Sequence, residues 1–178
     1  GGQGALADEI DEQVGAMRRQ VDRTLARARA GMAAALGYRS TPVGDAVNKT
    51  LRALQTLPGA QSLDWDADVA KGLCFAGDEG DLMEILGNLL DNARKWAHGQ
   101  IRLVAREAGE RDWTLVIEDD GPGLPEDEAL RIERGRRWDE SRPGTGFGLA
   151  IARDLVEAYR GVIGFSRSPD LGGLRVSI

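Results

Sequence analysis

The chain has 178 residues, of which 42% are hydrophobic and 29% charged, the ordinary balance of one folded globular domain with room for an appended element. Its 23 basic and 29 acidic residues give a net charge of −6, which argues against nucleic acid as a partner, while the single Cys and single His exclude an internal disulfide and a clustered zinc site. No apolar run approaches the roughly 20 residues that cross a bilayer, and the first residues lack the pattern of a signal peptide, so we expect no membrane contact by this segment.

The first predicted element is a long amphipathic helix over Leu6–Met32. Its apolar positions recur every three or four residues, close to a heptad seam. Because the apolar stripe is narrow and no strand lies nearby, we expect it to pack against other helices, as in a coiled coil or four-helix bundle, with packing on its own domain as the alternative. Gly37–Gly44, with Pro42 inside, predicts a break and therefore domains over 1–40 and 41–178.

The rest of the chain interleaves helical and strand patterns. The predicted helices cover Val47–Leu57, Asp81–Trp96 and Leu149–Tyr159, with a short helix near Asp127–Ile132. The predicted strands cover Ser62–Asp66, Gly72–Ala76, Ile101–Arg106, Trp113–Glu118, Val162–Ser166 and Leu174–Ile178. Since hairpin-linked strands occur at both ends, these elements predict an α+β fold, a sandwich in which helices cover one face of a mixed sheet.

A polar stripe on the predicted helix Asp81–Trp96 is the first candidate site. Glu84, Asn88, Asn92 and Lys95 follow one another at spacings of four, four and three, which places them on one face, roughly opposite the leucines. A solvated helix surface is one explanation. The other is a polar wall for a charged ligand, in which an amide oxygen holds Mg²⁺, the lysine meets a phosphate and the glutamate acts as a base.

The second candidate site follows the hydrophobic strand Trp113–Glu118. Asp119 is followed by Gly121 and Gly123, so the backbone can turn sharply and approach a flat ligand while the carboxylate accepts a hydrogen bond from an exocyclic amine. By itself this segment is equally well explained as a tight turn. It gains functional weight only in combination with a third site.

The third candidate site is a glycine-rich loop that leads directly into the predicted helix Leu149–Tyr159. The 24 glycines are nearly twice the usual share of about 7%. Three alternate here, so that backbone N–H groups and the positive helix end can bind an anion. The loop comprises Gly144, Thr145, Gly146, Phe147, Gly148 and Leu149. Arginines ahead of it favour phosphate contacts over a merely solvated loop. They are Arg134, Arg136, Arg137 and Arg142.

In their order and spacing along the sequence, the three candidate sites resemble the N box and the two glycine boxes of the Bergerat ATP-binding fold. That fold is shared by sensor histidine kinases, DNA gyrase-type topoisomerases, heat-shock chaperone ATPases and MutL-type mismatch-repair proteins. The resemblance covers Leu63–Ile178. Segments 88–95 (NLLDNARK), 118–125 (EDDGPGLP) and 134–146 (RGRRWDESRPGTG) are most similar to PhoQ-like sensor histidine kinases. The gyrase and chaperone branch implies ATP hydrolysis and a longer lid than the segment between Arg137 and Gly144.

The resemblance implies a role for each matching residue. Asp119 would receive the adenine amine, Gly121 and Gly123 would let the base lie close, and Asn88 would hold Mg²⁺ between the phosphates. Glu84 would lie where the family has its candidate base for the attacking histidine. The other residues lining the nucleotide pocket would be Asn92, Lys95, Arg137, Arg142, Gly144, Thr145, Gly146, Phe147, Gly148 and Leu149. PhoQ-like lids carry Gln at the Thr145 position, so no metal role is carried over to Thr145.

One departure from the family concerns the phosphoacceptor. In the family, the phosphoacceptor histidine begins a short motif: His, then Glu or Ser, then any residue, then Lys or Arg, then Thr and Pro. This motif is absent from the sequence, and His98 lies just past the predicted helix, which is the wrong element. We therefore expect a fragment that begins after the first helix of the dimerisation hairpin. Residues 1–40 would be its second helix, which pairs with a symmetry mate in a homodimer.

The expected function is that of the ATP-binding catalytic domain of a two-component sensor histidine kinase. With Mg²⁺, it would transfer the γ-phosphoryl group of ATP to a histidine on a helix not present in this chain, for relay to a response regulator. The segment would be cytoplasmic and its parent an inner-membrane sensor. The alternative is a non-catalytic ATP-binding or dimerisation module of a truncated or degenerate kinase.

Overall fold

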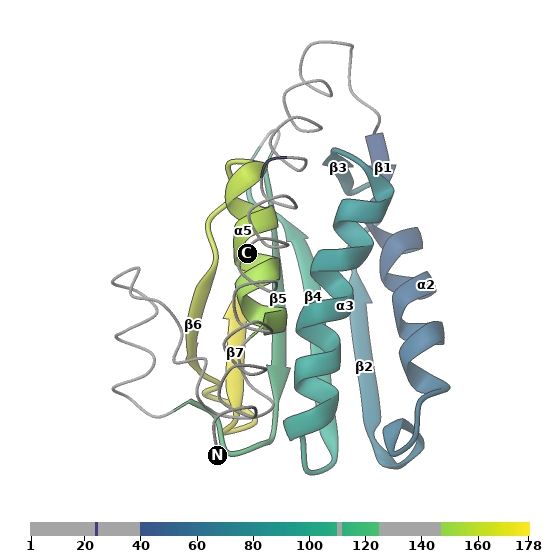
Figure 1. Ribbon diagram of the computed structural model, residues 1–178, viewed down its shortest axis with the longest axis vertical. Helices are drawn as coiled ribbons and strands as arrows, with labels where there is room; N and C mark the ends of the chain where they lie inside the picture. Colours follow the sequence, from purple (N-terminus) through teal and green to yellow (C-terminus); the bar gives the residue numbers. More distant parts are fainter. Residues whose placement is uncertain (1–23, 25–39, 110–111, 125–146) are drawn as a thin grey trace, which may run out of the picture.

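The computed structural model describes residue 24 and residues 40–109, 112–124 and 147–178 (Figure 1). Three sequence predictions lie outside these ranges: the helix over Leu6–Met32, the short helix near Asp127–Ile132, and the loop residues Arg134 to Gly146. The described part of the site comprises the polar stripe, the turn that begins at Asp119, and the helix that begins at Phe147.

A five-stranded mixed sheet forms the centre of the fold, and helices cover one of its faces (Figure 1). The helices are α2 (Val43–Gln55), α3 (Glu79–Trp96) and α5 (Phe147–Ala158), with a 3-10 helix, η1, at Ala60–Ser62. The strands, in spatial order, are β2 (Asp64–Val69), β4 (Gln100–Glu107), β5 (Trp113–Asp119), β7 (Leu174–Ser177) and β6 (Gly164–Arg167). A separate two-stranded sheet pairs β1 (Ser40–Pro42) with β3 (Cys74–Ala76). Within the five-stranded sheet β2 runs parallel to β4 and the other neighbours are antiparallel, which confirms the predicted α+β sandwich.

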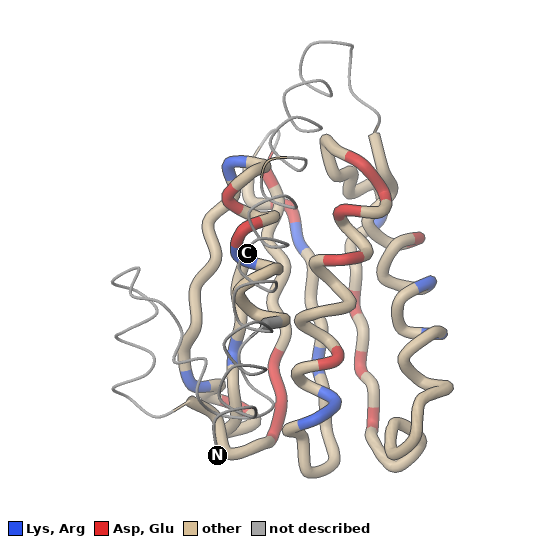
Figure 2. The backbone as a smooth tube through the Cα atoms, viewed as in Figure 1, with Lys and Arg blue, Asp and Glu red and all other residues tan. Residues whose placement is uncertain are grey.

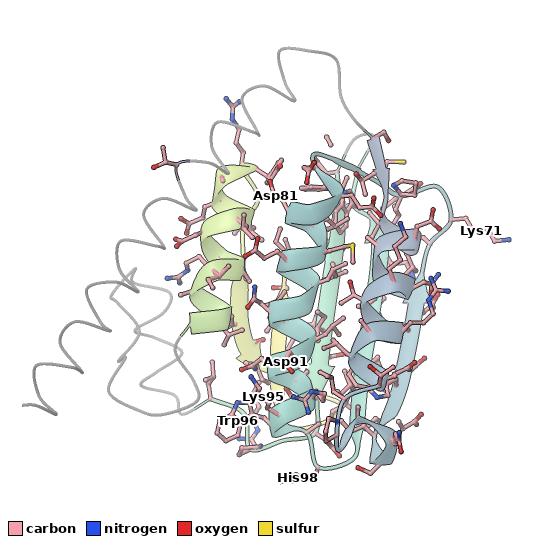
Figure 3. The ribbon with its side chains drawn as sticks, turned by 45° about the vertical axis from the view of Figure 1, so that its right-hand side comes forward. Lys71, Asp81, Asp91, Lys95, Trp96 and His98 are labelled. Carbon is pink, nitrogen blue, oxygen red and sulfur yellow. The ribbon has the colours of Figure 1, made fainter. Side chains whose placement is uncertain are left out.

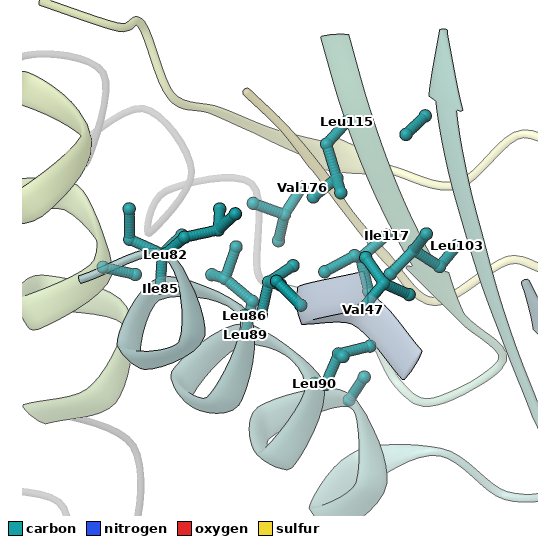
Figure 4. Packing of buried hydrophobic residues seen from close by; sticks show 14 of the residues in the cluster. Val47, Leu82, Ile85, Leu86, Leu89, Leu90, Leu103, Leu115, Ile117 and Val176 are labelled. Atoms are coloured by element: carbon teal, nitrogen blue, oxygen red, sulfur yellow. The ribbon is translucent and has the colours of Figure 1, made fainter. Parts of the chain in front are cut away.

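The hydrophobic core lies between the helices and the sheet (Figure 4). The apolar face of α3 is the one that its leucine spacing predicts, and each fully buried side chain of this kind contributes roughly 1.5–3 kcal/mol. The helices supply Val47, Leu82, Ile85, Leu86, Leu89 and Leu90, and the sheet supplies Leu103, Leu115, Ile117 and Val176. In the described ranges, no helix is both long enough and apolar enough to cross a membrane.

Local chemistry defines the ends of α3. Asp78 is the N-cap, and its Oδ1 accepts the Gly80 N–H at 2.9 Å. Acidic residues occupy the first turn of α3, and Arg94 and Lys95 occupy the last. The helix dipole favours negative charge at the first turn and positive charge at the last. These ends place the polar stripe so that its last member lies next to the loop that leads into β4.

Several strands differ in their bounds from the sequence predictions, and β3 and β6 each start two residues later than predicted. β1 lies within the predicted break Gly37–Gly44, because Thr41 pairs across a long sequence separation with Phe75. The strand predicted over Ser62–Asp66 starts two residues later and extends to Val69 as β2. Asp disfavours strands, yet acidic positions run along β2 (Figure 2). Parallel pairing with β4 and an ion pair from β4 to β2 between Arg106 and Asp68 stabilise this strand.

α5 packs antiparallel against α3. Gly148 near the start of α5 lies against Asn88, and Tyr159 just past its end reaches Asp81 in the first turn of α3. The Tyr159 hydroxyl donates to Asp81 Oδ2 at 2.7 Å, and Asp81 is only 1% exposed. Burial, and then the bond to Asp81, raise the pKa of Tyr159 to about 12. Tyr159 therefore connects the end of α5 to the first turn of α3.

Tyr159→Phe is expected to lower the free energy of unfolding by roughly 1–3 kcal/mol, because buried Asp81 loses the hydroxyl donor while the ring packing is kept. Urea denaturation measures the change. Glu157→Gln, an exposed position on the same helix, is the matched control and should stay within about 0.5 kcal/mol of the parent. Equal stability of Tyr159→Phe and the parent would contradict the assigned role of the hydroxyl.

Candidate functional site

Asp119, the last residue of β5, is a buried carboxylate at the start of the glycine-containing turn. It is 2% exposed, and its Oδ1 accepts the N–H of Gly121 at 2.9 Å and of Leu174 at 3.2 Å. Because both bonds end on Oδ1, the carboxylate has one defined orientation, and Oδ2 is the oxygen oriented for a further donor. Burial raises the pKa of Asp119 above its ordinary value, although the two backbone donors act in the opposite direction.

Glycines let the backbone close around Asp119. A Cβ at Gly121 would overlap the carbonyl oxygen of Trp96, and a Cβ at Gly173 would overlap the Asp119 backbone and carboxylate. Gly123 has a φ of 73°, in the left-handed region that favours glycine. The backbones of Gly121 and Gly173 therefore lie so close to Asp119 and Trp96 that only glycine fits at these two positions.

Asp120 and His98 join the end of α3 to the end of β5. Asp120 Oδ1 accepts the backbone N–H of His98 at 2.8 Å and of Gly99 at 3.0 Å, and the His98 ring Nδ1 lies 2.8 Å from the Asp120 carbonyl oxygen. Slight burial raises the pKa of Asp120, but the backbone donors outweigh it and hold that pKa below the ordinary value. His98 is thus an exposed residue at a helix end, as the sequence indicated.

Asn88 occupies the contact between α3 and the start of α5. Its Nδ2 donates to the Glu84 carbonyl oxygen at 2.8 Å, which leaves Oδ1 as the atom turned toward α5. A Cβ at Gly148 would lie 3.1 Å from that Oδ1. The amide oxygen therefore lies beside the amino-terminal turn of a 12-residue helix, where the helix dipole is positive.

Lys95 lies on the same face of α3 but is engaged in an ion pair (Figure 3). Its Nζ is 2.7 Å from Asp91 Oδ2, while Asp91 Oδ1 accepts Arg94 Nε at 2.9 Å. Although partial burial raises the pKa of Asp91, these two cations more than compensate and lower it. Half of the Lys95 side chain is exposed, so this ion pair is worth at most about 1 kcal/mol and can be exchanged for a phosphate.

The sequence-predicted site residues that the structure describes lie on three segments. Glu84, Asn88, Asn92 and Lys95 share one face of α3, Asp119 ends β5 and is followed by Gly121 and Gly123, and Phe147, Gly148 and Leu149 begin α5. Among these segments, Gly148 lies against Asn88. The Leu149 side chain is part of the hydrophobic core. The other predicted residues lie outside the described ranges, namely Arg137, Arg142, Gly144, Thr145 and Gly146.

Sequence reasoning missed Gly173 and Trp96. The Gly172–Gly173 pair gave only the signal of a plain turn, whereas Gly173 N donates to the Asp119 carbonyl at 3.0 Å across two strands. Trp96 is a large side chain that stays 40% exposed at the end of α3, with its backbone carbonyl against Gly121. Neither contact has a local sequence signal, because Trp96 and Gly121 are far apart in the chain and the Gly173 contact needs the register of β5 and β7.

Comparisons with known proteins concern the family of the chain. Residues 77–178 match the family of histidine kinase-, DNA gyrase B- and HSP90-like ATPases. The chain is 49% identical over 117 residues to the sensor protein kinase CarS of Pseudomonas aeruginosa, covering 65% of this chain and 25% of CarS. It is 33% identical over 168 residues to the sensor protein PhoQ of Escherichia coli K12, covering 94% of this chain and 34% of PhoQ. The chain thus spans about a quarter to a third of the length of these relatives.

The fold also matches solved structures of histidine kinases. The mycobacterial sensor histidine kinase MprB aligns with a TM-score of 0.68 and 23% identity, over 79% of this chain and 94% of the MprB chain. That likeness concerns the fold, and it agrees with the α+β sandwich described above. With more than half of its residues matched to one family, the chain belongs to the histidine kinase-, DNA gyrase B- and HSP90-like ATPases.

Proposed function

We propose that residues 41–178 are the ATP-binding catalytic domain of a sensor histidine kinase. The observation that carries the proposal is Asp119, a buried carboxylate that two backbone donors hold in one orientation at the start of the glycine-containing turn. Asp119 Oδ2 would accept the exocyclic amine of adenine, and Gly121 and Gly123 would let the ring lie against the backbone. A carboxylate accepts hydrogen bonds and an adenine amine donates them, so the pair is chemically matched.

The phosphates of ATP would lie between α3 and the start of α5. Asn88 is suited to bind magnesium. Its Nδ2 already donates a hydrogen bond to the Glu84 carbonyl oxygen, so its Oδ1 remains to coordinate the ion. Mg²⁺ commonly takes one or two protein oxygens together with substrate phosphates. When bound, the ion would neutralise charge that develops on the transferred phosphoryl group. Asn92 and Lys95 would line the same wall, with Lys95 exchanging Asp91 for a phosphate oxygen.

Phosphoryl transfer would then depend on positioning and charge. Exposed Glu84, one turn before Asn88, would orient or deprotonate the attacking histidine. The start of α5, with Phe147, Gly148 and Leu149, would place its N–H groups toward the phosphates. The preceding residues Gly144, Thr145 and Gly146 would wrap the phosphates, and Arg137 and Arg142 would reach the γ-phosphate.

The remaining part of the proposal concerns the parent protein. Residues 1–40 would be the second helix of the dimerisation hairpin, and the acceptor histidine would lie on the first helix of that hairpin. The phosphoryl group would pass from that histidine to the receiver domain of a response regulator. By analogy with CarS and PhoQ, which are sensor proteins, the parent would be a sensor. It would be a homodimer in a membrane, with this segment in the cytoplasm.

Calorimetry with ATP and ADP, with and without Mg²⁺, tests the nucleotide part of the proposal. We expect one site per chain and tighter ATP binding in the presence of Mg²⁺, with GTP as the matched control nucleotide that lacks the adenine amine. Transfer of ³²P from ATP to an added histidine-bearing hairpin then separates a kinase from a non-catalytic module. Tight ATP binding without transfer would favour the non-catalytic alternative, and no ATP binding would reject both.

A further inference from the structure

A second buried carboxylate lies directly before Asp119. Glu118 is 4% exposed and, as its neighbour in the strand, points to the opposite face of the sheet. Its Oε1 accepts the Ser168 hydroxyl at 2.9 Å and Arg175 Nη1 at 3.0 Å. The mechanism proposed above uses neither Glu118 nor Ser168, although Ser168 is itself only 2% exposed.

Ser168 organises the whole turn between β6 and β7. Its hydroxyl oxygen accepts the Leu171 N–H at 3.0 Å while donating to Glu118, so both hydrogen-bonding functions of the hydroxyl are used. Its backbone N–H donates to the Gly173 carbonyl at 2.8 Å, and its carbonyl accepts the Gly172 N–H at 3.1 Å. One serine therefore closes the turn 168–173 and anchors it to β5.

The far end of this turn holds Asp119. Regular pairing of β5 with β7 ends at Glu118 and Arg175. Beyond that point Gly173 donates to the Asp119 carbonyl at 3.0 Å, and Leu174 donates to Asp119 Oδ1 at 3.2 Å. The orientation of the carboxylate thus depends on where the turn places the Leu174 N–H.

We propose that Ser168 is a positioning residue for nucleobase recognition. By tying the turn to Glu118, its hydroxyl keeps the Leu174 N–H on Asp119 Oδ1 and so directs Oδ2 toward the exocyclic amine of a purine nucleotide. The inference rests on the proposed nucleotide site and adds a specificity determinant on the opposite face of the sheet. Preorganising a recognition group in this way increases affinity only for ligands that carry the atom that the group contacts.

The test compares ATP with purine riboside triphosphate, which is ATP without its exocyclic amine. In Ser168→Ala the affinity for ATP should fall roughly threefold to tenfold, the range that corresponds to the loss of one ordinary hydrogen bond. The affinity for the amine-free analogue should stay within about twofold. Ser166→Ala, an exposed serine two residues earlier on β6, is the matched control and should leave both affinities unchanged.

A measurement without nucleotide supports the same test. The Leu174 donor lowers the pKa of Asp119, so loosening the turn should raise that pKa in Ser168→Ala, as followed by carboxyl NMR. Equal losses of affinity for ATP and for the amine-free analogue would overturn the inference while leaving the proposed function intact. The same holds if neither the ratio of the two affinities nor the Asp119 pKa changed in Ser168→Ala. A parent chain that bound neither nucleotide would overturn both.

Discussion

Asp119→Asn is expected to weaken ATP binding by roughly 100-fold, about as much as removing the side chain, while leaving the fold intact. The reason is the two backbone donors on Oδ1. An asparagine must place its amide oxygen there, which turns its NH₂ group toward the ligand. Two donors, the amide and the adenine amine, would then face each other. Titration calorimetry with ATP measures the loss.

Asp120→Asn is the matched control for this substitution. It removes the same charge from the adjacent residue, but Asp120 Oδ1 accepts the backbone N–H groups of His98 and Gly99, and an amide oxygen can do the same. ATP affinity should stay within about threefold of the parent. If Asp120→Asn and Asp119→Asn weakened binding equally, a general loss of negative charge would be the cause and the adenine contact would be rejected.

Asn88→Ala is expected to abolish the dependence of ATP affinity on Mg²⁺ and to reduce phosphoryl transfer to an added hairpin at least about 100-fold. The substitution removes an amide oxygen that lies beside Gly148 at the start of α5, and the amide nitrogen of Asn88 is hydrogen-bonded within α3. The measurement is a pair of ATP titrations with Mg²⁺ and with a chelator. Parent and variant should differ with Mg²⁺ and coincide without it.

Asn48→Ala provides the control for Asn88→Ala. Asn48 is an exposed asparagine on α2, so its removal changes composition and helix propensity in the same way without touching the site. Its ATP titrations should match those of the parent under both conditions. An Asn88→Ala protein that kept the parent's Mg²⁺ response would show that another group holds the metal.

Much of the site could be predicted from the sequence because its parts are local. Residues at i, i+4 and i+8 share a face of any helix, so Glu84, Asn88 and Asn92 had to line one side of α3 once the leucines indicated that helix. Likewise, the order of residues alone predicted a carboxylate at the end of a strand, followed by Gly121 and Gly123. The hairpin of β4 and β5 was also predictable, since its strands are neighbours in sequence.

Other parts could not be predicted because they depend on contacts between distant segments. No local pattern indicates that β2 pairs in parallel with β4, or that Thr41 lies opposite Phe75. Lys95 was expected to face a phosphate. Its ion pair with Asp91 is instead a local contact, since the two residues lie four positions apart on one helix.

By itself, the sequence determined the polar stripe, the glycine turn after β5 and the α+β class, because helical period, strand alternation and glycine content act over a few residues. Only the tertiary structure decided which oxygen of Asp119 is left for a ligand. That choice rests on Leu174, 55 residues away, whose N–H reaches the carboxylate only when β7 lies beside β5 in the observed register. The other donor, Gly121, is local, but the contact with Leu174 is made only by the assembled strands, and no spacing along the chain encodes it.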